Sequence, residues 1–96
     1  MNEVRQTEYF AKWLEGLRDR LAKSKVLVRI DRLRVGLVGD ARPVGGGVSE
    51  LRIDSGPGYR LYFVRRGREL FILLVGGDKG SQNRDIRRAI EMASRL

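Results

Sequence analysis

The spacing of apolar residues changes once along this chain, and that change limits the fold more than any other feature. In residues 7 to 37 the apolar side chains recur every three or four positions, as in amphipathic helices. From residue 48 they alternate with polar ones, as in strands with one face on a core. A chain of 96 residues is expected to form one domain. We therefore predict a single α+β domain over residues 1–96, with a helical hairpin packed on a small antiparallel sheet of three to four strands.

Two helices are predicted in the first third of the chain. The first runs from Thr7, a suitable N-cap, to Ala22, and Ser24 caps the second. Because the loop between them is short, the two helices should pack as a hairpin. Their apolar stripes are Phe10, Leu14, Leu17 and Leu21 in the first helix, and Val26, Ile30, Leu33 and Leu37 in the second.

The pattern in the second half of the chain predicts an antiparallel meander followed by a C-terminal helix. Strands are expected at residues 48–54, 59–65 and 69–75, with turns at 55–58 and 66–67. The unbroken apolar run of the third strand is typical of a central strand buried on both faces. Residues 2–6 are a candidate for a further short strand, and the glycine-rich residues 44–47 are expected to be locally mobile. The last helix is marked by Ile86, Ala89, Ile90 and Ala93.

Two residue types are missing, and their absence excludes several classes of enzyme. The chain has no histidine and no cysteine, so a Ser-His-Asp triad, a cysteine nucleophile, a disulfide framework, a zinc ribbon and zinc hydrolysis are all excluded. No stretch is long and apolar enough to span a membrane, and the first residues lack the apolar run of a signal peptide. We expect a cytoplasmic protein without membrane contact.

The chain is strongly basic, with a net charge of +8, and 16 of its 20 basic residues are arginines. Guanidinium groups can fork onto phosphate oxygens and stack on bases, so nucleic acid or an acidic protein is the expected partner. A solvated basic surface without a specific partner is the alternative reading.

Polar side chains on two neighbouring strands form the strongest candidate site. Strand alternation places Glu50 and Arg52 on the more open face, and Arg60 and Tyr62 on the same face of the next strand. An ordinary set of cross-strand salt bridges would show the same pattern. The Gly-Gly-Asp-Lys-Gly-Ser loop at residues 76–81 could place Lys79 and backbone amides near a phosphate, or simply connect a strand to a helix.

Three segments in order resemble a known family. They are Gly-Val-Ser-Glu-Leu-Arg-Ile (47–53), Gly-Pro-Gly-Tyr-Arg-Leu-Tyr-Phe (56–63) and Leu-Leu-Val-Gly-Gly-Asp-Lys-Gly-Ser-Gln (73–82). Together with the order of elements, they resemble the RelE/ParE toxin superfamily, and within it the HigB-like addiction module killer proteins. The resemblance implies a toxin of a type II toxin-antitoxin module, neutralised by an antitoxin of helix-turn-helix type that makes the contacts to operator DNA.

The same superfamily contains two activities on one fold. The resemblance favours a ribosome-dependent endonuclease that cleaves mRNA by attack of the neighbouring 2′-OH, with no metal and no cofactor. The alternative is a non-enzymatic inhibitor of DNA gyrase, as in the ParE branch. A third reading is a protein whose main role is to pair with its antitoxin in repression of their operon.

Within the endonuclease reading, the resemblance implies residue roles. Arg60 would bind the phosphate and stabilise the transition state, and Glu50 would be the general base. Arg52 would bind the RNA backbone, and Lys79 would stabilise charge or donate a proton.

Three further residues have roles in RNA contact under this reading. Tyr59 and Tyr62 are candidates for base stacking, and Tyr62 could in principle supply a proton. Asp85 lies close to the position where cleaving members carry a tyrosine or histidine. The chain departs from the pattern there, so the group that protonates the leaving oxygen is left open.

Overall fold

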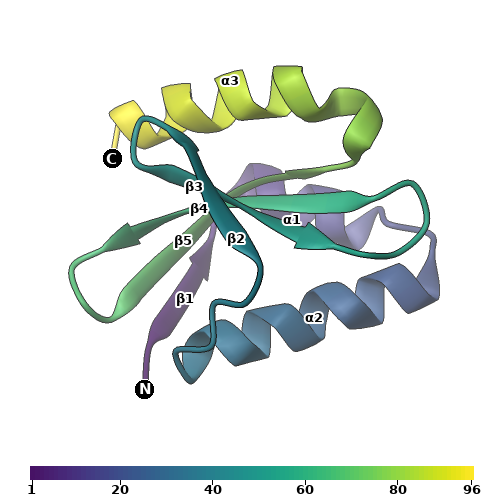
Figure 1. Ribbon diagram of the computed structural model, residues 1–96, viewed down its shortest axis with the longest axis horizontal. Coiled ribbons are helices and arrows are strands. Elements are labelled where there is room, and N and C mark those ends of the chain that lie inside the picture. Colours follow the sequence, from purple (N-terminus) through teal and green to yellow (C-terminus); the bar gives the residue numbers. More distant parts are fainter.

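A computed structural model describes all residues from Met1 to Leu96. The sheet lies in the middle of the molecule, with α1 and α2 against one face and α3 against the other (Figure 1). In chain order the elements are β1 (Glu3–Gln6), α1 (Glu8–Glu15), α2 (Arg20–Arg34), β2 (Ala41–Gly45), β3 (Val48–Ile53), β4 (Tyr59–Arg66), β5 (Leu70–Gly77), the 3-10 turn η1 (Lys79–Ser81) and α3 (Gln82–Ser94).

The predicted α+β class is confirmed, whereas the sheet is larger than predicted. It has five strands in the order β1-β5-β4-β3-β2. Strands β3, β4 and β5 form the expected antiparallel meander, and β5 is an inner strand buried on both faces. The candidate strand at residues 2–6 exists, but it pairs with β5 in parallel, so the sheet is mixed.

Strand β2 was not predicted, because its sequence carries Pro43 and Gly45, residues that interior strands avoid. It lies at the edge of the sheet, where a proline is tolerated. The glycine-rich segment expected to be mobile forms the tight turn between β2 and β3. Gly46 has φ 60° there and a Cβ would lie 2.8 Å from Ile90, so glycine is required.

The helix boundaries differ from the prediction. Thr7 caps α1 as expected, its hydroxyl accepting from the amide of Phe10, but α1 ends at Glu15 and not at Ala22. The second helix begins earlier, because the side chain of Asp19 accepts from the amide of Ala22 and caps it, a role predicted for Ser24. Leu21 and Leu37 continue the helical spacing but are 63% and 60% exposed, so they do not belong to the buried stripes.

The sheet separates two cores of different character. On the α1 and α2 side, eleven buried apolar residues pack together, among them Phe10, Ile30 and Leu61. On the α3 side the buried apolar cluster has seven residues, including Tyr62 and Ala89. The alternation of β3 and β4 therefore sends one set of side chains to a large apolar core and the other set to the region described next.

Candidate functional site

The pairing of β3 with β4 brings the predicted residues together. Glu50 lies opposite Tyr62, and Arg52 lies opposite Arg60. The prediction that these four side chains share one face is thereby confirmed. Arg60 also pairs with Gly77 on β5, so the patch lies where the meander runs into the η1 loop.

The face is not open, however, because Glu50 is completely buried. Its Oε2 accepts from the hydroxyl of Tyr62 at 3.0 Å and from the amide of Gln82 at 2.9 Å. Its Oε1 accepts from Nε of Arg42 at 3.2 Å, and Nε of Arg60 lies 3.7 Å from Oε2. Helix α3 covers this face, which the strand pattern alone could not indicate. The carboxylate is thus surrounded by donors that belong to the protein.

Tyr62 lies on the inner side of this network, and its ring is 0% exposed. Burial, followed by the charge of Glu50 and the hydrogen bond to it, raises the pKa of the phenol well above its ordinary value. The ring offers no free face to a base, and the proton is donated to a buried carboxylate. The predictions of base stacking and of proton donation by Tyr62 therefore do not fit this structure.

Arg60 is held at the border between the core and the surface. It is 6% exposed, and one terminal nitrogen donates to the carbonyl of Gly58 at 2.8 Å. Its Nε is buried without a hydrogen-bond partner. Gly58 has φ 82°, which favours glycine, so the hairpin loop that looked like a plain turn supports this guanidinium. A buried donor without a hydrogen bond is costly, and the charge of the nearby Glu50 carboxylate offsets part of that cost.

A pocket of about 440 Å³ opens beside Arg60. It contains Arg52 and Lys79 as well, so the three cations with predicted roles at the RNA phosphates line one site. Neither Arg52 nor Lys79 forms an ion pair within the chain. The remaining lining residues are Asp40, Ile53, Asp54, Gly58 and Tyr59.

Tyr59 is half-buried in this pocket and contacts Trp13 edge to face, with ring centroids 6.3 Å apart. Its ring therefore belongs partly to the apolar core on the α1 side. Of the two tyrosines predicted to stack on bases, only Tyr59 lies at the pocket.

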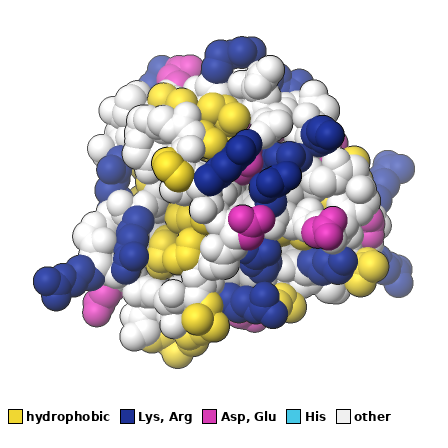
Figure 2. All heavy atoms as spheres, in the orientation of Figure 1, with side chains coloured by type: hydrophobic (Ala, Val, Ile, Leu, Met, Phe, Trp, Pro, Cys, Tyr) yellow, Lys and Arg dark blue, Asp and Glu magenta, His cyan; other side chains and the backbone are white.

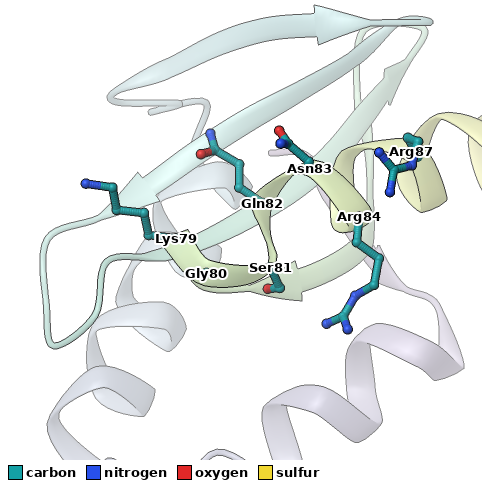
Figure 3. A pocket seen from close by; sticks show the side chains of 7 residues that line it. All are labelled: Lys79, Gly80, Ser81, Gln82, Asn83, Arg84 and Arg87. Carbon is teal, nitrogen blue, oxygen red and sulfur yellow. The ribbon is translucent and has the colours of Figure 1, made fainter.

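A second hollow of about 350 Å³ continues from Lys79 around the start of α3. Figure 3 shows Lys79 at one end of it and Arg84 and Arg87 at the other, with Gln82 and Asn83 between them. No apolar side chain lines this hollow. The polar surface around the first pocket thus extends along the loop from η1 into α3.

Asp85, predicted to contact RNA, is 2% exposed and turned inward. Its carboxylate accepts from the hydroxyl of Ser81 and lies so close to β5 that a Cβ on Gly77 would be 1.9 Å from Oδ2. The side chain packs closely against Gly77 at the end of β5 and accepts its hydrogen bond from η1. The buried position of Asp85 does not favour contact with RNA, and that role stays a prediction.

Sequence reasoning missed several residues of the site. Gln82 and Arg42 both donate hydrogen bonds to Glu50. Their segments were not predicted to contact Glu50, because no local sequence pattern indicates such long-range contacts. Asp54 was detectable, because it continues the alternation of Glu50 and Arg52 by two residues, and it lines the pocket.

Charge and composition of the surface are consistent with a polyanionic partner. Figure 2 shows Lys and Arg side chains spread over the visible face and outnumbering Asp and Glu. No group of three or more carboxylates gathers anywhere in the chain. None of the helices has the length and apolar content needed to cross a bilayer.

Comparison with known proteins gives one family and one close relative. Residues 12–96 match the family described as "Phage derived protein Gp49-like (DUF891)". A protein of Haemophilus influenzae, described only as uncharacterized, is 44% identical over 94 residues, which is 98% of this chain and 95% of the relative. The matched residues include every side chain of the pocket and of the Glu50 network.

Proposed function

Since the chain belongs to the Gp49-like family of phage-derived proteins, which is associated with toxin-antitoxin modules, we propose that it is the toxin of such a module and that it cleaves mRNA at the ribosome. Its partner would be a cognate antitoxin, and operator DNA would be contacted through that antitoxin. The observation that carries the proposal is the pocket in which Arg60, Arg52 and Lys79 converge.

The chemistry that this pocket suits is transfer of a phosphate to the neighbouring 2′-OH. The step forms a bond between the 2′-oxygen and phosphorus and breaks the bond to the 5′-oxygen. Negative charge builds up on the equatorial oxygens in the transition state, where preorganised cations are most effective. We assign this stabilisation to Arg60, because its guanidinium lines the pocket and is held in place by the carbonyl of Gly58 and the carboxylate of Glu50.

For Glu50 we propose a positioning role in place of the general base. Its side chain is 0% exposed and both oxygens already accept hydrogen bonds, so it orients Arg60 and does not reach a substrate hydroxyl. The carboxylates that do line the pocket are Asp40 and Asp54, and one of them is the better candidate for proton abstraction. Lys79 is exposed and is proposed to protonate the leaving oxygen.

RNA binding beyond the reacting phosphate is assigned to Arg52 and Tyr59. Arg52 is exposed at the pocket mouth, where a backbone phosphate would neutralise it. The Tyr59 ring is half-buried and rests against Trp13, so one base could stack on its remaining surface.

The test compares wild type with Arg60→Ala in cells and in vitro. Primer extension should show new 5′ ends within translated codons for wild type, and a loss of about 10²–10³-fold in cleavage rate for the variant. Gyrase supercoiling is measured in parallel. Gyrase inhibition with intact mRNA would contradict the endonuclease and favour the ParE-like alternative.

The role of Glu50 is tested with Glu50→Gln, which keeps the shape of the side chain. If Glu50 positions Arg60, the variant should cleave more slowly with an unchanged pH profile. If Glu50 is the general base, the variant should lose the acidic limb of that profile. Asp40→Asn and Asp54→Asn serve as the comparison, because the variant that loses the acidic limb of the pH profile identifies the base.

A further inference from the structure

The outer face of α2 carries apolar side chains that nothing in the chain covers. Leu21 is 63% exposed, Val28 is 47% exposed and Val35, the C-cap residue, is 58% exposed. These three residues, here called the outer stripe, are seven positions apart and so lie along one side of the helix. The buried residues of α2, such as Val26 and Ile30, face the sheet.

The same helix is strongly basic. Its fifteen residues include six Lys or Arg and one acidic residue, Asp31, which pairs with Arg34. Burial lowers the pKa of Arg29, and the neighbouring charge of Arg32 lowers it further. Positive charge on this helix is therefore largely uncompensated within the chain.

A groove of about 280 Å³ runs between α2 and the end of β3. Val28 and Ile53 supply its apolar residues, and the other lining residues are Ser24, Lys25, Arg29, Arg32 and Asp54. Two of the basic side chains donate to backbone carbonyls at the end of β3: Lys25 to that of Asp54, and Arg29 to that of Arg52. The groove thus combines two apolar residues with three basic side chains, Lys25, Arg29 and Arg32, here called the rim.

This combination distinguishes the groove from the pocket of the proposed active site. RNA phosphates would neutralise the rim but would leave Leu21 and Val28 without a partner. A second copy of the same face would bring like charges together, which is destabilising. An acidic amphipathic helix satisfies both requirements, because its apolar side chains cover the stripe and its carboxylates meet the cations.

We propose that the outer stripe and this groove are the docking surface for an acidic amphipathic helix of the antitoxin. The identity of the partner rests on the proposed function, whereas its chemistry follows from the surface itself. Ile53 and Asp54 line both this groove and the pocket that contains Arg60. A helix seated on the groove therefore abuts the pocket and obstructs entry of RNA.

The first experiment measures binding of a synthetic probe to the intact chain by fluorescence anisotropy. The probe is a labelled helical peptide with leucines on one face and glutamates on the other, and its companion carries serines in place of the leucines. The leucine peptide is expected to bind at least about tenfold more tightly, as burial of apolar side chains requires. Equal affinities, or binding of neither peptide, would overturn the proposal.

Matched variants locate the binding surface. Val28→Ser and Arg32→Glu are each expected to weaken binding of the leucine peptide about tenfold or more. Arg87→Glu on α3 makes the same change in net charge on the opposite side of the sheet and should leave the affinity within about twofold. An equal loss in Arg87→Glu would show that net charge alone attracts the peptide. Circular dichroism establishes that each variant is folded.

A labelled single-stranded RNA separates the two basic surfaces. Arg32→Glu should leave RNA affinity unchanged, and RNA should bind less when the leucine peptide is present. If Arg32→Glu weakens RNA binding more than peptide binding, the α2 face is a nucleic-acid surface and the proposal is overturned. Peptide binding is read without any cleavage, so failure of the endonuclease assay would leave this result interpretable.

Discussion

The two faces of the sheet bury their side chains in different ways. The face under α1 and α2 holds eleven apolar residues and no buried charge, whereas the face under α3 holds seven together with Glu50, Arg60 and Asp85. Burial of charge costs free energy even when the charges are paired, and replacement by apolar residues is often neutral or stabilising. The α3 face therefore retains charges that stability alone does not require, and it does so where the pocket opens.

Two adjacent glycines at the end of β5 show the same contrast on a small scale. A Cβ on Gly76 would lie 2.1 Å from the ring of Trp13, on the α1 side. A Cβ on Gly77 would lie 1.9 Å from Asp85, on the α3 side. Gly76 makes room for an apolar ring, and Gly77 makes room for a buried carboxylate. On each face, a side chain packs directly against the backbone of β5 at a glycine.

The largest effect is expected from Phe10→Ala, which opens a cavity in the apolar core. Phe10 is 0% exposed, and its loss should lower the free energy of unfolding by about 3–5 kcal/mol, measured by urea denaturation. Tyr9→Ala, next to it and 41% exposed, is the control and should cost less than about 1 kcal/mol. Equal losses would mean that this face is not the main source of stability.

The paired variants Gly76→Ala and Gly77→Ala should each cost about 1–3 kcal/mol through overpacking. They differ in what they displace. Gly76→Ala should shift the fluorescence emission of Trp13, the one tryptophan of the chain, whereas Gly77→Ala should displace Asp85 and leave that emission unchanged. A common shift in both variants would show that the two faces are mechanically coupled.

Tyr62→Phe should cost about 1–2 kcal/mol near neutral pH, because the hydrogen bond to Glu50 is lost. The raised pKa of Tyr62 gives this cost a pH dependence. Below the ordinary tyrosine pKa of 10.0 the phenol is protonated in both states and its contribution is complete. Above that value the unfolded chain releases the proton first, so wild type loses up to about 1.4 kcal/mol per pH unit. The stability gap between wild type and variant should therefore narrow from about pH 10 upward. A constant gap would contradict the burial of this phenol.

The smallest effect is expected from Glu8→Gln on the surface of α1. Glu8 lies 3.3 Å from Lys12, and both side chains are largely exposed. The pair should contribute less than about 0.5 kcal/mol, and less still at high salt. A loss comparable to that of Tyr62→Phe would mean that exposed charges matter as much as the buried ones.

The sequence predicts those parts of the fold that depend on local periodicity. The meander, the shared face of Glu50 and Tyr62, and the cap at Thr7 all follow from side-chain alternation or from a single capping residue. The end of α1 does not, since the stripe of Phe10 and Leu14 continues in register into Leu21 although the chain turns between them.

The burial of Glu50 could not be predicted from the sequence, because it depends on contacts between distant segments. Strand parity places Glu50 on a face, but the covering residue, Gln82, is 32 positions away along the chain. Edge strand β2 supplies Arg42 from a segment rich in proline and glycine, which local propensity assigns to a loop. The pattern therefore indicates which side chains meet, whereas the tertiary packing decides whether water reaches them.

The parallel pairing of β1 with β5 also sets an order in time for the synthesis of this chain. Glu3 pairs with Leu70, and the hydroxyl of Thr7 donates to the carbonyl of Leu74. At about 5–20 residues per second, the first strand waits roughly 3–14 s for its neighbour to be translated. The pocket needs Lys79, which follows β5, and so it is completed later still. Any activity of the pocket therefore first arises after β5 and Lys79 have been translated, and a fragment that stops before β5 leaves β1 without its partner strand and Arg60 without its pairing to Gly77.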